Sequence, residues 1–513
     1  MKISLINPPR SRYDRSEIAP PLGLLRLAGE VNRADKDVSL VDFNLLYHLR
    51  PELAGDKFYE CAVALLLDEE ADIYGFTSMA VDSHVALHLA KLLKHARPEA
   101  LIILGGPHFS SIAEQVIENY PWINFVMKGE GEVGFRNFIN AQRGTYSSNI
   151  QKVLATQPTL HELSPLPYEL VDLGAYFTIN PRCCLDFEEG RGCRFKCAFC
   201  YSPVHYSGVR NFSIDVSIEE LHRLTRLGAK HVFFVEDNFI NDPAHAITFC
   251  HELEKARLNL TWNCYATLPQ LSTEVITSMA RAGCTSIFAG VDAVGEFSQK
   301  AYRKRFLRQD SELRRKIVEC VESGIEPTCA FLLSPPSHPC GVDTEATLRA
   351  ALMSCNSGAQ VVLNTLTLYN QTKVQTNAAL RMEADETKAT LMLDIPEVVE
   401  KNEYAQTNPH LFPFHSRYVP GPEWSSFISG AHCLLTLFLC YPQTIETIWL
   451  EKDISPLEIA SEVKSAVGDL SLIEKPLRRD AELAVIISII EKLMTTRKMQ
   501  TLLEVESLAL LNA

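Results

Sequence analysis

The segment Gly192-Cys193-Arg194-Phe195-Lys196-Cys197-Ala198-Phe199-Cys200-Tyr201 carries three cysteines in the spacing CxxxCxxC. It directly follows an apolar run of strand length at residues 185–189. Three thiolates so close together on one loop can hold three corners of a cubane iron–sulfur cluster, which leaves the fourth iron without a protein ligand. An open metal position is what separates a catalytic metal site from a structural one. The segment therefore predicts a cluster-binding loop at the end of a strand in an α/β domain.

Other interpretations of these cysteines stay open. A zinc site needs a fourth Cys or His, and His205 is close enough in sequence to supply it. An electron-carrier cluster needs a fourth cysteine; none lies downstream before Cys250, while Cys183 and Cys184 lie upstream, across a strand. That adjacent pair could bind a soft metal or a substrate, although thiols at the start of a strand are more often simply buried.

Downstream of the cysteines, runs of strand length alternate with helical stretches. Such βα units in series predict an open or partial barrel, whose catalytic residues lie at the carboxyl ends of its strands. The predicted strands are residues 185–189, 231–236, 261–267, 285–291, 328–333 and 361–368.

The first 135 residues show the same alternation, with predicted strands at residues 2–7, 38–43, 73–78, 101–105 and 125–128. Short apolar strands separated by helices indicate a parallel, doubly wound sheet, and ligands of such sheets bind at the carboxyl ends of the strands. Glycine in these turns lets the backbone approach a bulky ligand closely, whereas a plain α/β domain would need only tight turns. The five strand ends read Asn7-Pro8-Pro9, Asp42-Phe43-Asn44, Phe76-Thr77-Ser78-Met79, Gly105-Gly106-Pro107-His108 and Lys128-Gly129-Glu130-Gly131-Glu132.

The predicted organisation is a Rossmann-like domain at residues 1–135, a linker at 136–182, a barrel domain at 183–375 and a mostly helical capping region at 376–513. The capping region ends in a strongly helical run at residues 481–499. Its segment 411–427, rich in aromatic residues and prolines, is either a substrate-facing loop or a domain interface.

Composition limits the possible functions of the 513-residue chain. Hydrophobic residues make up 46% and charged residues 22%, as in packed soluble proteins rather than disordered chains. The formal charge of −14 disfavours a protein that holds a nucleic-acid backbone. The start of the chain shows no secretory signal, and the longest apolar run, residues 427–441, is too short to span a bilayer and predicts a buried helix. With 15 cysteines and no secretory signal, the chain is expected to be cytoplasmic.

Taken together, these motifs resemble the radical S-adenosylmethionine (SAM) superfamily, in its branch with an N-terminal cobalamin-binding domain. The resemblance spans about residues 1–375 and rests on CxxxCxxC with an aromatic before its last cysteine and on the pieces NPPR, PPLGLLRLA, LGGPHF and KGEGE. It implies three cofactors: a [4Fe–4S] cluster, SAM and cobalamin. It implies cluster ligation by Cys193, Cys197 and Cys200; SAM contacts from Phe199, Glu236, Asp237, Asn238 and Asp292; and cobalamin contacts from Asn7, Pro8, Pro9, Asp42, Ser78, Gly105, Gly106, Pro107, His108, Gly129 and Glu130.

The resemblance also implies a reaction, the methylation of an unactivated carbon of a peptide or secondary metabolite through a 5′-deoxyadenosyl radical and methylcobalamin. Cobalamin-dependent rearrangement, cyclisation or ring contraction is the alternative, and a non-catalytic metal- or corrinoid-binding protein is a third possibility. An external donor of flavodoxin or ferredoxin type is expected to supply electrons, with neither a nucleic-acid partner nor a membrane span. The sequence departs from the family at Ser334-Pro335-Pro336 and Tyr369-Asn370-Gln371-Thr372, and Asp42-Phe43-Asn44 lacks the histidine of a DxHxxG cobalt-ligand motif.

Overall fold

The chain divides into two units in the computed structural model. The first holds Met1–Asp237, Glu252–Trp262 and Thr367–Val419, and the second holds the remainder of the chain. The described residues are 1–10, 18–33, 37–141, 152–156, 160–292, 294–304, 310–333, 339–377, 381–384, 403–419, 434–435, 437–467, 486–493, 500–503 and 505–507.

The first unit contains a six-stranded parallel sheet in the order β2-β1-β3-β4-β5-β6. The chain passes from β1 to β2 on one side and then returns to β3 on the other side of β1. The edge at the carboxyl ends of β1 and β3 is therefore a topological switch point, where doubly wound folds bind their ligands. The strands are β1 (Lys2–Asn7), β2 (Asp37–Asp42), β3 (Ile73–Phe76), β4 (Leu101–Leu104), β5 (Phe125–Gly129) and β6 (Lys152–Thr156).

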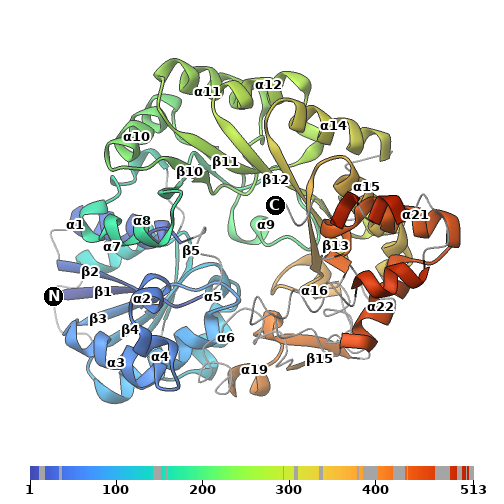
Figure 1. The fold of residues 1–513 in the computed structure, drawn as a ribbon. Helices are drawn as coiled ribbons and strands as arrows, with labels where there is room; N and C mark the ends of the chain where they lie inside the picture. The colour runs from blue at the N-terminus through green and yellow to red at the C-terminus, as the bar shows by residue number, and fades with distance from the viewer. Residues whose placement is uncertain are drawn as a thin grey trace. The chain divides into compact units, whose positions relative to one another are not determined.

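Two hydrophobic clusters cover the faces of this sheet because successive strand residues point to opposite sides. Ile3 and Leu5 pack with Leu24 and Phe135, and Ile6 belongs to the cluster on the other face. Helices α1 and α7 lie on one side of the strands, and α3 and α4 on the other (Figure 1). The helices of this region are α1 (Leu22–Arg33), α2 (Phe43–Leu49), α3 (Phe58–Asp68), α4 (Ser83–Ala96), α5 (Pro107–Ser111), α6 (Ala113–Asn119) and α7 (Glu132–Ala141).

The stretch between the predicted domains contains more regular structure than a linker. Strand β6 pairs with β5 at the sheet edge, and helix α8 (Leu173–Ile179) follows it. Within β6, the apolar run is only Val153-Leu154-Ala155, and a run of this length is too short to be recognised as a strand from the sequence.

The cysteine segment also lies in the first unit, between two short paired strands, β8 (Gly190–Arg191) and β9 (Arg210–Asn211). These strands are antiparallel, with Arg191 opposite Arg210. They close a loop at residues 192–209, which holds the three cysteines and helix α9 (Ser202–His205). Just before this loop, β7 (Cys184–Phe187) pairs in parallel with β10 (His231–Phe234), and helix α10 (Ile214–Arg226) connects the loop to β10.

A distant part of the chain completes the first hydrophobic core. Tyr404, Ala405 and Phe412 are buried among residues of the N-terminal sheet. Strands β15 (Arg381–Ala384) and β16 (Ser416–Val419) pair antiparallel, so the region predicted as mostly helical also contains a short sheet. In sequence, helix α16 (Lys373–Asn377) precedes β15, and helix α19 (Glu403–Thr407) lies between the two strands.

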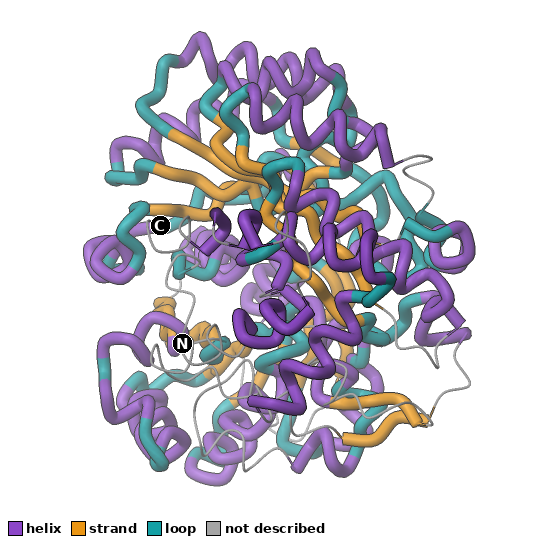
Figure 2. Tube along the Cα trace, turned by 45° about the vertical axis from the view of Figure 1, so that its right-hand side comes forward, coloured by secondary structure: helices purple, strands orange, loops and turns teal. Residues whose placement is uncertain are grey.

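The second unit is built from βα units. Strands β12, β13 and β14 are parallel neighbours, with α14 between β12 and β13 and α15 between β13 and β14 in sequence. Figure 2 draws the strands in orange and the helices in purple. All six strands predicted for the barrel are present, with ends within three residues of the prediction; β12, β13 and β14 belong to the second unit, and β7 and β10 to the first. The remaining elements are α11 (Pro243–Ala256), β11 (Thr261–Ala266), α12 (Thr273–Arg281), β12 (Cys284–Asp292), α13 (Glu296–Ala301), α14 (Asp310–Glu322), β13 (Glu326–Leu333), α15 (Thr344–Asn356), β14 (Gln360–Thr365), α21 (Pro442–Lys452) and α22 (Pro456–Val467).

The predicted α/β fold class is thus confirmed. Within the described part of the chain, no helix has both the length and the apolar character needed to cross a bilayer. Residues 427–433 of the predicted apolar helix, both ends of the predicted helix 481–499 and Ser334-Pro335-Pro336 lie outside the described residues.

Candidate active site

A cavity of 360 Å³ in the first unit lies at the switch-point edge of the N-terminal sheet. Much of its wall is glycine backbone, from Gly75, Gly105, Gly106, Gly129 and Gly131. Among the residues predicted to contact cobalamin, the cavity is lined by Asn7, Gly105, Gly106, Pro107, Gly129 and Glu130.

The geometry of this wall explains why the sequence needs glycine there. Gly106 has φ +89°, and a Cβ at this position would lie 2.6 Å from the Ser78 carbonyl oxygen. By contrast, a Cβ at Gly23, which also lines the cavity, would meet nothing within 4 Å. Gly106 is therefore required by its positive φ and by its close packing against Ser78, whereas the open space beside Gly23 suits a bulky cofactor such as a corrinoid.

The other predicted cobalamin residues do not line this cavity. Asp42 is buried and accepts hydrogen bonds from Asn7 Nδ2 at 2.8 Å and Tyr176 Oη at 2.6 Å. Burial raises the pKa of Asp42, although both of these hydrogen bonds oppose the shift. Asp42 therefore fixes the Asn7 side chain from behind, while Pro8, Pro9 and Ser78 also lie outside the cavity lining.

His108 is likewise buried behind the wall. Its ring lies 5.8 Å from the rings of both Phe109 and Phe412, measured between centroids. Burial, with a smaller contribution from His415, lowers the pKa of His108 to about 3. His108 is thus a neutral packing residue in this structure and does not line the cavity.

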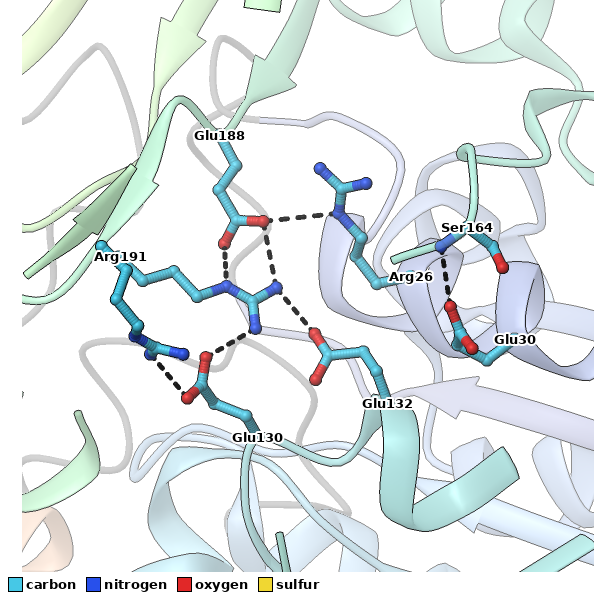
Figure 3. Close-up of polar contacts among 8 residues, drawn as sticks. Arg26, Glu30, Glu130, Glu132, Ser164, Glu188 and Arg191 are labelled. Carbon is cyan, nitrogen blue, oxygen red and sulfur yellow. Dashed lines mark hydrogen bonds and ion pairs between the residues drawn. The ribbon is translucent and has the colours of Figure 1, made fainter. Parts of the chain in front are cut away.

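An arginine that also lines the cavity holds three carboxylates. Arg191 donates from Nη1 to Glu130, from Nη2 to Glu132 and from Nε to Glu188, each at 2.7 Å (Figure 3). Arg26 lies 3.4 Å from Glu188 in the same network. The planar guanidinium suits this arrangement because its donors leave in fixed directions.

The network is buried and balanced in charge. The Arg191 and Glu130 side chains are only 5% and 4% exposed. Burial alone would raise the pKa of Glu188, but Arg191 and Arg26 outweigh it and hold that pKa below its usual range. With Arg210 bound to Glu130 at 2.6 Å, three carboxylates face three guanidinium groups.

The cysteine loop begins immediately after Arg191. Gly192 has φ +85°, and a Cβ there would lie 2.0 Å from the Gly208 carbonyl oxygen, so the base of the loop is tightly packed. Cys193, Cys197 and Cys200 are all partly exposed.

Hydrogen bonds tie the loop to other segments of the first unit. The Ser202 N–H points to Cys200 Sγ at 3.4 Å, and the Tyr201 hydroxyl donates to the Pro107 carbonyl oxygen. The Val374 N–H donates to the Ala198 carbonyl oxygen at 3.1 Å.

The three thiols come from one loop, as the protein ligands of a cubane do. Across the part of the chain that the structure describes, no three or more His, Cys, Asp or Glu side chains gather closely enough to hold one ion. In a cubane each cysteine binds a different iron, so the three thiols need not converge on one point.

Two of the predicted SAM contacts, Glu236 and Asp237, follow β10 in the first unit. Asp237 accepts a hydrogen bond from Ser202 Oγ at 2.7 Å, and burial raises its pKa. Glu236 is 5% exposed; burial first, and then the Glu189 carboxylate, raise its pKa well above the usual value. A third, Phe199, is half-buried in the cysteine loop.

The remaining predicted SAM contacts, Asn238 and Asp292, belong to the second unit. Asn238 is fully buried and donates from Nδ2 to Gln270 at 2.9 Å. Asp292 ends β12 with φ +62° and forms an ion pair with Lys304.

Several cavity residues were not predicted from the sequence. Arg191 and Glu188 are the main ones, together with Tyr206. Arg191 could have been suspected, because a charged residue directly before Gly192 must sit at the base of the cysteine loop. Its partners Glu130 and Glu132 lie about 60 residues away in sequence, so only the fold brings them together.

His205 was considered as a fourth zinc ligand. It lines the cavity, and its Nδ1 is buried with no hydrogen-bond partner among the described residues. Burial, together with the nearby Arg191, lowers the pKa of His205 to about 4, so the ring is neutral near pH 7.

Two family models match the chain, and together they cover more than half of it. The B12 binding domain matches residues 15–139, and the Radical SAM superfamily matches residues 188–338.

Two curated relatives are similar to this chain in sequence. The uncharacterized methyltransferase PH0819 of Pyrococcus horikoshii is 26% identical over 57% of this chain and 66% of its own length. The cobalamin-dependent radical SAM methyltransferase TokK of Streptomyces tokunonensis is 25% identical over 37% of this chain and 30% of its own. The chain thus spans less than two thirds of the length of these relatives.

A solved structure shares the fold. The cobalamin-dependent SAM radical enzyme OxsB, with aqua-cobalamin and SAM bound, superposes with a TM-score of 0.60 over 98% of this chain and 83% of its own, at 14% identity. This likeness confirms the predicted fold, and the two family models confirm the predicted cofactor classes at the level of the domains. The chain therefore belongs to the cobalamin-binding radical SAM enzymes, with a B12-binding domain followed by a radical SAM domain.

Proposed function

We propose that the protein transfers a methyl group from SAM to an unactivated carbon of a small-molecule or peptide substrate. The observation that carries this proposal is the composition of the cavity. Its lining combines strand ends of the B12-binding domain, such as Asn7 and Gly105, with Arg191 and His205 at the cysteine loop. One space thus adjoins both predicted cofactor loops, as a reaction that uses both cofactors requires. The relatives PH0819 and TokK are both named methyltransferases.

When bound, the cluster and SAM would supply a 5′-deoxyadenosyl radical, and cobalamin would carry the methyl group. Cys193, Cys197 and Cys200 would hold the cluster. The Ser202 N–H, which points at Cys200 Sγ, favours the thiolate that a metal needs. An external donor of flavodoxin or ferredoxin type would deliver the electron.

The residues after β10 would bind SAM. Ser202 Oγ holds the Asp237 carboxylate in place, so that its other lone pairs can accept from the SAM amine. In the cavity, the glycines Gly105, Gly106 and Gly129, together with Asn7, would contact the corrinoid.

The test uses the full chain, purified and reconstituted without oxygen. Given hydroxocobalamin, SAM and a strong reductant, we expect bound corrinoid, about four irons per chain, 5′-deoxyadenosine and S-adenosylhomocysteine. S-Adenosylhomocysteine reports methyl donation by SAM, and 5′-deoxyadenosine reports reductive cleavage.

The control variants separate cluster ligation from general thiol effects. The triple variant C193S/C197S/C200S should lose iron and 5′-deoxyadenosine, and C61S, at a cysteine of α3 outside the loop, should keep both. If 5′-deoxyadenosine forms with bound corrinoid but S-adenosylhomocysteine never appears, even with candidate substrates, methyl transfer is wrong and rearrangement or cyclisation takes its place. Zinc in place of iron after reconstitution would overturn both.

A further inference from the structure

We propose that Glu130 is a positioning residue that joins both ends of the cysteine loop and couples that loop to corrinoid binding. The proposal deepens the proposed function, since it takes from it the assignment of the cluster to this loop and of the corrinoid to the cavity.

One carboxylate bridges the two ends of the loop. Glu130 Oε1 accepts from Arg191 Nη1 at 2.7 Å, and Glu130 Oε2 accepts from Arg210 Nη2 at 2.6 Å. Arg191 and Arg210 are opposite each other in the β8–β9 pair that opens and closes the loop. The side chain of Glu130 therefore adds a second closure to the one that the strand pair makes.

Burial makes this closure stiff. The Glu130 side chain is 4% exposed, Arg191 is 5% exposed and Arg210 is 23% exposed. Charge-assisted hydrogen bonds away from water are short and directional, so the two guanidinium groups follow the carboxylate when it moves.

The turn that carries Glu130 is also part of the cavity wall. Gly129, Glu130, Gly131 and Glu132 all line the cavity. Gly129 has φ +83°, and its N–H donates to Ser110 Oγ at 3.0 Å. A ligand that fills the cavity must therefore press on the backbone of this turn.

Movement of the turn reaches the cysteines by a short route. Arg191 is followed by Gly192 and Cys193, and a Cβ at Gly192 would lie 2.0 Å from the Gly208 carbonyl oxygen, so the two ends of the loop pack closely at its base. The corrinoid site and the cluster loop thus share one rigid connection, and their binding free energies are coupled. Such coupling is reciprocal: cluster loading changes corrinoid affinity by the same factor as corrinoid changes cluster affinity.

The test measures that coupling directly. Hydroxocobalamin affinity is determined by visible titration of the full chain, before and after cluster reconstitution, and the ratio of the two dissociation constants is the coupling. For the wild type we expect a ratio of roughly 5- to 150-fold. In E130Q the ratio should fall toward one, and the electron paramagnetic resonance spectrum of the reduced cluster should change.

Two matched variants separate the bridge from ordinary ion-pair loss. E132Q removes the other link from this turn to Arg191 but leaves both Arg191 and Arg210 on Glu130, so it should lower the coupling by less than E130Q does. E114Q removes the exposed ion pair of Glu114 with Lys128, one residue before the same turn, and should behave as wild type. If E130Q keeps the wild-type ratio and spectrum, or if the wild-type ratio is one, the proposal is wrong.

Two further measurements distinguish misfolding of E130Q from failure of the proposed function. R210Q breaks only the more exposed end of the bridge, so it tests the proposal if E130Q does not fold, with the same loss of coupling expected. If the wild type takes up no iron, the proposed function fails. The bridge is then judged by amide hydrogen exchange of residues 192–209: hydroxocobalamin should slow exchange in the wild type but not in E130Q, and equal protection in both would overturn it.

Discussion

Arg191 Nη2 donates a hydrogen bond to Glu132 Oε1 at 2.7 Å, although Arg191 precedes the cysteine loop and Glu132 begins helix α7. The local sequence around either residue gives no sign that the two are in contact. Their contact joins the turn after β5 to the strand that opens the cysteine loop. Through this contact, the switch-point edge of the first sheet, where doubly wound folds bind ligands, shares the buried Arg191 network with the start of the cysteine segment.

Removing Arg191 should therefore destabilise the chain strongly. The variant R191M leaves Glu130, Glu132 and Glu188 buried with fewer cationic partners, and breaking a buried ion pair in this way costs about 3–5 kcal/mol. Urea denaturation of the cofactor-free protein measures the change. The control is K91M, whose exposed pair with Glu403 is expected to contribute about 0–1 kcal/mol. Equal stability of R191M and K91M would contradict the assigned role of the network.

The sequence predicted the strands and the cluster loop, but it could not predict this network. Strand positions depend on local apolar runs, and the CxxxCxxC spacing carries its chemistry within one loop. The pairing of Arg191 with Glu130 and Glu132 depends on which loops the fold brings together. The same limit explains Asp42, which the pattern placed at a ligand edge and the structure places behind Asn7 as its hydrogen-bond acceptor.

A second prediction concerns the glycine wall. In G106A the new Cβ would lie 2.6 Å from the Ser78 carbonyl oxygen at a backbone conformation that favours glycine, with φ +89° and ψ 173°. The conformation alone costs about 1–3 kcal/mol for another residue, and the clash adds to it. G105A is the matched control, because its Cβ would come no closer than 3.7 Å to Met127. Thermal unfolding should show a large loss of stability for G106A and a small one for G105A.

Replacing Gly23 with alanine should raise the stability of the chain while weakening its binding of the corrinoid. This residue lies in the first turn of α1 and lines the cavity, and a Cβ there would meet nothing within 4 Å. Replacing a helical glycine with alanine stabilises a helix by up to about 1 kcal/mol. We expect G23A to unfold at a higher temperature than the wild type and to bind hydroxocobalamin roughly tenfold more weakly, equivalent to about 1.4 kcal/mol. Unchanged affinity would place the corrinoid away from this wall.

His108 should make the fold sensitive to acid without affecting corrinoid binding. Its folded-state pKa of about 3 lies below the value of 6.5 expected in the unfolded chain. Between these two values the unfolded chain binds more protons than the folded one, so stability is complete above pH 6.5 and is lost as the pH falls. At pH 5 the loss from this residue is about 2 kcal/mol.

The variant H108Q removes the titrating ring while keeping a neutral side chain. The difference in unfolding free energy between wild type and H108Q should therefore shift in favour of the variant by about 2 kcal/mol between pH 7 and pH 5. Because His108 lies outside the cavity lining, H108Q should bind hydroxocobalamin with wild-type affinity at pH 7. A loss of affinity at unchanged stability would instead return His108 to the corrinoid site, where the sequence pattern had placed it.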